Sequence, residues 1–121
     1  MTGLGAYPTT MTAEEHDRLM SLISHLPQLA ASALMHLVGE RTGAEGLALA
    51  GRGLRDTTRL ASSPPDIWRD ISASNADNIA RAIDELVAIL LQLRPQTSTS
   101  ADALQQTFHS AARWKRLLEG D

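Results

Sequence analysis

Aliphatic side chains recur at a period of about 3.6 residues along most of the chain after residue 12. In the first such stretch, the apolar positions are Leu19, Leu22, Ile23, Leu26, Leu29, Ala30, Ala33, Leu34 and Leu37. This spacing gathers them on one side of an α-helix, whereas a half-buried strand would alternate with a period of two. No alternating pattern follows residue 10. The sequence therefore predicts an all-α fold.

Five helical segments are expected, and capping or proline signals mark several of their ends. Thr12 and Glu15 form a capping-box pattern at the start of the first helix, and Pro27 should kink that helix. Ser63 followed by proline is a typical N-cap for a short helix. A core of aliphatic residues suits helices, because the chain is 43% hydrophobic but only 3% aromatic. The expected ranges are about 12–40, 43–61, 65–72, 75–93 and 101–118.

Charge and composition exclude several kinds of partner. The net charge is −3 with a single lysine, so there is no basic stripe of the kind that binds nucleic acid or anionic membranes. Residues 19–38 contain too many polar side chains for a lipid-exposed span and are expected to form a central protein helix. The absence of cysteine excludes disulfides and thiolate metal sites and is compatible with a cytoplasmic protein. His16 and Asp17 have no further ligand at metal-site spacing, so no metal site is expected.

A polar stripe runs along the otherwise apolar first helix. It consists of Asp17, Ser21, Ser24, His25 and Gln28, at positions i, i+4, i+7, i+8 and i+11. One interpretation is local: Ser24 and His25 bond the carbonyls that the proline leaves without a donor. The other is functional, with the stripe facing a ligand in a cleft.

Three arginines lie close together before the next turn. Arg52, Arg55 and Arg59 precede a segment that presents Trp68, and guanidinium is well suited to bidentate capture of a carboxylate or phosphate. Arg52 and Asp56 are spaced for a surface ion pair. Arg55 and Arg59 form a like-charge pair, so either they lie on a solvated face or at least one meets a buried carboxylate. Trp68 is either core filler or the wall of a binding site or subunit contact.

The chain lacks the usual nucleotide-binding and nucleophile motifs. No G-x-G-x-x-G follows a strand pattern, and there is neither a Walker loop nor a nucleophile elbow. No cofactor is expected to bind to this chain.

Taken together, several short segments resemble the C-terminal helical domain of the prephenate/arogenate dehydrogenases, the NAD(P)-dependent enzymes of tyrosine biosynthesis. The resemblance covers most of the chain, and the order and spacing of the segments carry it. The matching segments are Leu4-Gly5-Ala6, residues 11–17, Ser24-His25-Leu26-Pro27, residues 56–61, and residues 65–71 followed by Asn75.

The resemblance implies a helical domain similar to the C-terminal domain of 6-phosphogluconate dehydrogenase, which forms an intertwined homodimer and closes a substrate cleft. In the enzyme that the resemblance implies, a separate Rossmann domain carries NAD or NADP and the catalytic histidine. The substrate, prephenate or arogenate, undergoes oxidative decarboxylation, which converts prephenate to 4-hydroxyphenylpyruvate. The residues implied to bind substrate are Ser24, His25, Gln28, Arg59 and, from the neighbouring subunit, Trp68. Many prephenate-preferring members have histidine where this chain has Gln28, so the choice between the two substrates stays open.

The same resemblance divides the chain. Residues 1–11 are expected to be the end of a nucleotide-binding domain, and residues 12–121 to be the dimerisation and substrate-closing domain. Without the Rossmann domain, the chain is not expected to be a dehydrogenase by itself. Two alternatives remain: a stand-alone, non-catalytic helical dimer that acts as a regulator or scaffold, and a chorismate-mutase-like bundle suggested by residues 82–87. The second would need several cations converging on a dianion.

Overall fold

A computed structural model describes residues 10–95 and 100–120, all of them in helices, turns or short connections and none in a strand. The all-α prediction is confirmed. The described chain divides into two compact units, Thr12–Ala82 and a second that contains Ile83–Asp121. Most of the expected N-terminal segment (residues 1–11) and of the polar linker (residues 96–100) lies outside the described residues.

Helix α1 (Ala13–Met20) begins with the predicted capping box. The Thr12 N–H donates to Glu15 Oε1 at 3.0 Å, and the Glu15 N–H donates to Thr12 Oγ1 at 3.1 Å. Two backbone donors that the first helical turn leaves without partners are satisfied in this way. The hydrogen bonds from Thr12 lower the pKa of the Glu15 carboxyl, because they favour its ionised form.

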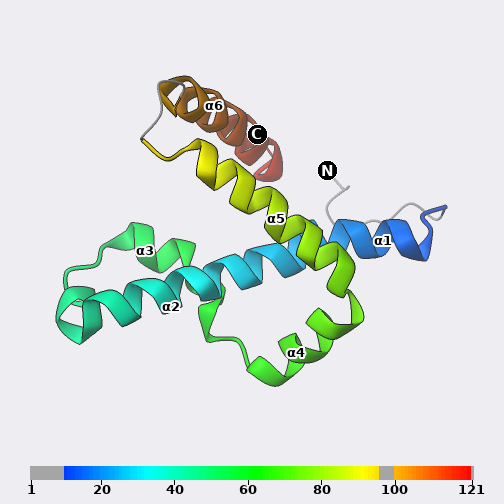
Figure 1. Cartoon of the computed structure of the whole chain (residues 1–121), viewed down its shortest axis with the longest axis horizontal. Coiled ribbons are helices and arrows are strands. Elements are labelled where there is room, and N and C mark those ends of the chain that lie inside the picture. Colours follow the sequence, from blue (N-terminus) through cyan, green and yellow to red (C-terminus); the bar gives the residue numbers. More distant parts are fainter. Residues whose placement is uncertain (1–9, 96–99, 121) are drawn as a thin grey trace. The chain divides into compact units, whose positions relative to one another are not determined.

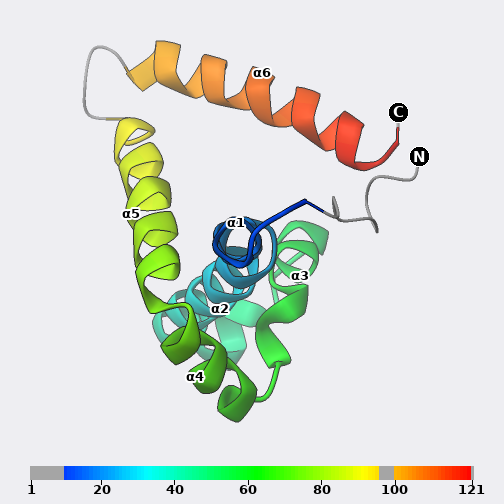
Figure 2. The ribbon, with the colours of Figure 1, turned by 90° about the vertical axis from the view of Figure 1, so that its right-hand side faces the viewer.

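Pro27 disturbs the helix through a π-helical turn, not through a sharp bend. The turn, η2 (Ser21–His25), joins α1 to α2 (Leu26–Leu47), and the Leu26 N–H donates to the Ser21 carbonyl five residues earlier. Proline has no N–H, so an ordinary helix would leave a carbonyl unpaired here. Figure 1 shows α1 and α2 as one long rod, and Figure 2 shows them almost end-on, close to a common axis.

The second expected helix, over residues 43–61, is wrong as a continuous element. The break near Gly43 is present, since Gly43 has φ 65° and interrupts the end of α2. Gly51 is extended, with φ −103° and ψ −161°, and only then does α3 (Arg52–Thr57) begin, followed by the 3₁₀ turn η3 (Arg59–Ser62). The glycines provide backbone conformations outside the helical region, and they divide the segment into short pieces.

The remaining helices match their predicted ranges closely. They are α4 (Pro65–Ser74), α5 (Ala76–Gln92) and α6 (Ser100–Leu118). Helix α4 starts one residue later than Ser63 suggested, because Pro64 is the N-cap and Pro65 the first helical residue. Asn75 separates α4 from α5: its N–H bonds to the Ile71 carbonyl, and its own carbonyl accepts from the Ile79 N–H.

Burial in the described residues favours small apolar and polar side chains over large aliphatic ones. The buried apolar residues are Ala31, Ile79 and Ala82, and the buried polar residues are Ser21, Gln28, Thr58 and Asn75. Large apolar side chains on α6 stay uncovered, with Phe108 64% and Leu117 65% exposed. Among the described residues, no helix is both long enough and apolar enough to cross a membrane.

We predict that the capping box makes stability depend on pH through Glu15. Because its folded pKa is lowered, the contribution is present above the unfolded pKa of about 4.3 and is lost as pH falls through the folded pKa. Glu15→Gln should therefore flatten the fall in urea midpoint between about pH 6 and pH 3. Glu14→Gln is the matched control, and an equal flattening in both variants would contradict the prediction.

Candidate functional site

A buried glutamine ties the long helix to the turn after α3. Gln28 is 5% exposed. Its Nε2 donates to the Leu60 carbonyl at 2.6 Å and to Ser32 Oγ at 3.2 Å, while its Oε1 accepts from Ser63 Oγ at 3.1 Å. The Gln28 side chain thus bonds both the middle and the end of the segment from Arg59 to Ser63, which packs against α2. In this structure Gln28 is a structural residue, and its contact with substrate stays a prediction.

A groove of about 500 Å³ opens beside this glutamine. Helix α2 provides one wall, and the start of α4 with the preceding turn provides the other. The only formally charged side chain in its lining is Arg69, whose Nη2 is paired with Asp66 Oδ1 at 2.7 Å. The lining residues are Gln28, Leu29, Ser32, Ala61, Ser63, Pro65, Trp68, Arg69 and Ser72.

Trp68 and His25 meet within one chain. Their ring centroids are 6.0 Å apart and the ring planes are inclined by 78°, an edge-to-face arrangement. Trp68 also lines the groove, so the histidine contacts a residue of the groove wall without lining the groove itself. The approach of Trp68 to the site of a neighbouring subunit, which the resemblance implies, stays a prediction.

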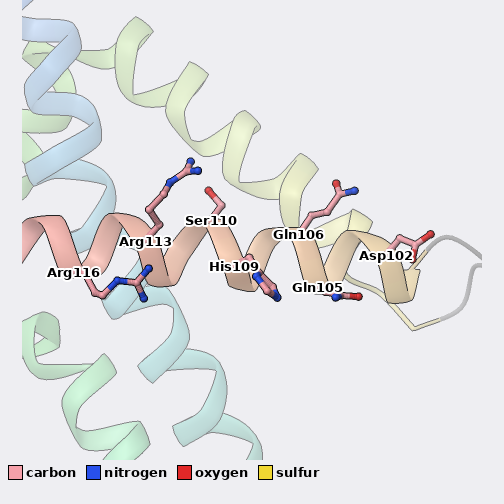
Figure 3. A pocket seen from close by; sticks show the side chains of 7 residues that line it. All are labelled: Asp102, Gln105, Gln106, His109, Ser110, Arg113 and Arg116. Carbon is pink, nitrogen blue, oxygen red and sulfur yellow. The ribbon is translucent and has the colours of Figure 1, made fainter.

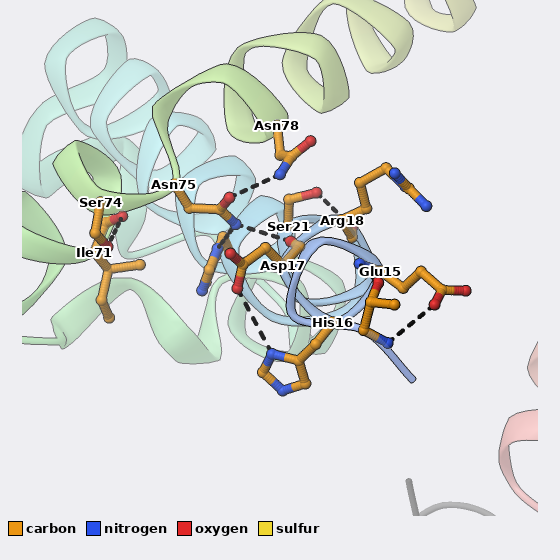
Figure 4. Close-up of polar contacts among 11 residues, drawn as sticks. Glu15, His16, Asp17, Arg18, Ser21, Ile71, Ser74, Asn75 and Asn78 are labelled. Carbon is orange, nitrogen blue, oxygen red and sulfur yellow. Dashed lines mark hydrogen bonds and ion pairs between the residues drawn. The ribbon is translucent and has the colours of Figure 1, made fainter. Parts of the chain in front are cut away.

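The Nδ1 atom of His25 lies next to a pair of asparagine amides. Asn75 Nδ2 lies 3.3 Å from His25 Nδ1 and donates to the backbone carbonyl of Asp17 at 2.9 Å. Asn78 Nδ2 donates to Asn75 Oδ1, also at 2.9 Å. Figure 4 shows Asn75 between Asp17 on α1 and Asn78 on α5. Asn75 is only 9% exposed, so this contact joins α1 and η2 to the α4–α5 junction inside the protein.

The polar stripe of the first helix is thus mostly used for packing. Ser21 Oγ donates to the Arg18 carbonyl at 2.6 Å, next to the π turn. His25 contacts Asn75 and Trp68 and is not seen to bond the carbonyls near Pro27. Ser24 is half-buried and makes no hydrogen bond within the described part of the chain, which leaves its hydroxyl available.

The arginines lie on the surface of the single chain. Arg52, Arg55 and Arg59 are exposed. The ion pairs found in residues 10–95 and 100–120 are His16–Asp17, Arg69–Asp66 and Lys115–Glu119. The Arg52–Asp56 pair, which the spacing predicted, is therefore not formed among these residues. Of the two alternatives for Arg55 and Arg59, the described residues show the solvated face, with no protein carboxylate beside either guanidinium; a ligand carboxylate stays a prediction. Arg59 begins the η3 turn, one residue before the carbonyl that Gln28 holds.

Of the five residues predicted to bind substrate, the structure brings three together: His25, Gln28 and Trp68. Arg59 lies at the start of the segment that Gln28 fixes, and Ser24 precedes His25 on the π turn. The sequence-based reasoning missed two residues, Asn75 and Ser63, as partners of the site. An asparagine between two predicted helices was the available signal for the first, because such a side chain often bonds a helix end.

A second hollow, of about 670 Å³, lies along α6 and contains none of the predicted residues. All of its lining comes from this one helix. Figure 3 shows that Gln106 and Arg113 leave the helix on one side and Gln105 and His109 on the other. The side chains therefore do not converge on a common point. Within the described residues, no group of three or more potential metal ligands is found.

We predict that Gln28→Leu lowers the free energy of unfolding by about 1–3 kcal/mol, because it leaves the part-buried Leu60 carbonyl and the Ser63 hydroxyl with fewer partners. Urea denaturation followed by circular dichroism measures the change. Ser32→Ala removes only the longest of the three bonds and should cost less than about 1 kcal/mol. Equal losses in the two variants would show that the Leu60 bond does not stabilise the turn.

Comparison with known proteins places these features in a family. A family model described as the prephenate dehydrogenase dimerization domain matches residues 12–110. A prephenate dehydrogenase of Bacillus subtilis is 38% identical over 96 residues, which is 78% of this chain and 26% of that protein. A cyclohexadienyl dehydrogenase of Zymomonas mobilis is 30% identical over 122 residues, covering 98% of this chain and 42% of that protein.

A solved structure agrees with the sequence matches. The crystal structure of a Corynebacterium glutamicum protein, described provisionally as a prephenate dehydrogenase, superposes with a TM-score of 0.71 at 30% identity, over 86% of this chain and 33% of that one. The chain thus spans less than half the length of these relatives. Because the family model covers more than three-quarters of the residues, the chain belongs to the family of prephenate dehydrogenase dimerization domains.

Proposed function

We propose that the chain is the dimerisation and substrate-closing domain of a dehydrogenase that acts on prephenate or on its amino analogue, arogenate. The observation that supports this most strongly is the meeting of His25, Gln28 and Trp68 in one place within the matched domain. The relatives named as prephenate and cyclohexadienyl dehydrogenases suggest the substrate class.

The available side chains suit a small, cyclic acid. Arg59 is exposed and has no carboxylate partner among the described residues, so its guanidinium is free to form a bidentate pair with a substrate carboxylate. Ser24 and His25 offer hydrogen bonds, and the Trp68 indole offers an apolar face to a six-membered ring. Fixing the η3 turn through Gln28 reduces the freedom that Arg59 must lose when substrate binds.

The oxidant must come from elsewhere. The sequence has no G-x-G-x-x-G motif, and residues 10–95 and 100–120 contain no strand from which a phosphate-binding turn could start. The residues present do not fit NAD or NADP. We therefore assign the cofactor to a separate nucleotide-binding domain, and to this chain only the binding and enclosure of the substrate.

A second copy of the chain is the proposed partner of the uncovered apolar surface. The second half of α5 exposes Val87, Ile89, Leu90 and Leu91, and α6 exposes Leu104, Phe108, Trp114, Leu117 and Leu118. Many exposed apolar side chains on neighbouring turns of a helix are unfavourable in water and indicate a protein interface. The family description, a dimerization domain, points to a homodimer, for which we expect an interface above about 2,000 Å².

Arg59→Ala should raise KM for the preferred substrate by roughly 30- to 700-fold, because losing a charge-assisted bidentate pair costs about 2–4 kcal/mol. Steady-state kinetics with prephenate and with arogenate, in the dehydrogenase that includes the nucleotide-binding domain, measure this. Arg55→Ala, at an equally exposed arginine four residues earlier, is the control. The anion site is elsewhere if the two variants change KM by the same small factor.

Phe108→Asp should weaken the homodimer, because it places a carboxylate in an apolar interface. Light scattering after size-exclusion chromatography should show a dimer for the wild-type chain at micromolar concentration and a monomer for the variant. His109→Asp adds the same charge about 100° around α6 from Phe108, at a position outside the exposed apolar residues, and should leave the dimer intact. A wild-type monomer would contradict the assignment of this surface.

A further inference from the structure

The orientation of every amide in the group around Asn75 is fixed from both ends. At one end, Arg81 Nη1 donates to Asn78 Oδ1 at 3.3 Å, and an arginine can only donate. The Asn78 amide nitrogen therefore faces Asn75 Oδ1, at 2.9 Å. At the other end, the Asp17 carbonyl can only accept, so the Asn75 atom 2.9 Å away is the nitrogen. Both ends therefore give the same orientation of the Asn75 amide, with Oδ1 toward Asn78 and Nδ2 toward Asp17.

This orientation determines the state of His25. Asn75 Nδ2 carries two hydrogens, and one of them is used by the Asp17 carbonyl. The other is available to His25 Nδ1, which lies 3.3 Å from Asn75 Nδ2. Because an amide nitrogen cannot accept, Nδ1 of the histidine must be the acceptor, and the ring hydrogen must be on Nε2.

We propose that Asn75 is a positioning residue that fixes His25 as the neutral Nε2–H tautomer. His25 then presents a hydrogen-bond donor, not a base, to an oxygen atom of the ligand. The edge-to-face contact with Trp68 also limits the orientation of the ring. The ligand class, a small carboxylic acid, rests on the proposed function, whereas the tautomer rests on the contacts alone.

The tautomer is measured directly on the full chain labelled with ¹⁵N-histidine. Long-range ¹H–¹⁵N correlation spectra distinguish the two ring nitrogens, and His25→Gln identifies its signals among the four histidines. We expect His25 to occur as Nε2–H alone, whereas an unconstrained imidazole populates both forms. In Asn75→Asp the neighbouring group only accepts, so the hydrogen should move to Nδ1. Asn75→Ala should give a mixture.

Ser74→Ala is the matched control, because its hydroxyl donates to the Ile71 carbonyl and makes no contact with His25. It should leave the tautomer unchanged. A wild-type His25 that carries hydrogen on Nδ1, or that populates both forms, overturns the proposal even if the Asn75 variants do not fold. So does an Asn75→Asp spectrum that still shows Nε2–H alone.

Kinetics in the complete dehydrogenase separate this inference from the proposed function. Asn75→Asp should raise KM for the acid substrate by roughly 2- to 10-fold, the effect of one neutral hydrogen bond, with little change in kcat. If Arg59→Ala has no effect on KM, the proposed function fails while the tautomer result stands. If Arg59→Ala raises KM as predicted, but His25 keeps the same tautomer in the Asn75→Asp variant, only this inference fails.

Discussion

Two buried amides, Gln28 and Asn75, hold together segments that are far apart in the sequence. Gln28 joins α2 to the turn 32 residues later, and Asn75 joins the α4–α5 junction to the Asp17 carbonyl 58 residues earlier. Amides suit this role because each both donates and accepts, so a single side chain satisfies several buried groups. Among the described residues, no buried side-chain nitrogen or oxygen lacks a partner. Gln28 bonds the turn that follows Arg59, and Asn75 contacts His25.

Unlike these buried polar side chains, many of the large apolar side chains are exposed to solvent. Among the described residues, the buried apolar side chains are those of Ala31, Ile79 and Ala82, while large side chains in the second half of α5 and on α6 are exposed. Hydrophobic burial is the main favourable term in folding, and this chain leaves much of its aliphatic surface without that stabilisation. The homodimer that we propose would cover this surface, and it would account for periodic apolar stripes that do not form a core within one chain.

Local signals predicted most of the helices, and failed where the backbone left the helical region. The capping box at Thr12 and the helix starting after Ser63 depend on contacts within a few residues, so they were visible in the sequence. The segment from residue 43 to residue 61 was not, because aliphatic spacing there resembles a helix while Gly43 and Gly51 adopt other conformations. For the candidate site, the polar stripe identified His25 and Gln28, but its partners Asn75 and Ser63 come from 50 and 35 residues away.

The sequence by itself determined the helical fold class and the residue types of the candidate site, because these follow from periodicity and side-chain chemistry. It located the irregularity near Pro27 but predicted a kink, where the structure has a π-helical turn. Only the tertiary structure decided which contacts those residues make within the chain: Gln28 bonds the Leu60 carbonyl, His25 contacts both Asn75 and Trp68, and Arg59 is exposed. The physical reason is that hydrogen bonds between distant residues depend on how the helices pack, and no local pattern records which side chains that packing brings within 3 Å of each other.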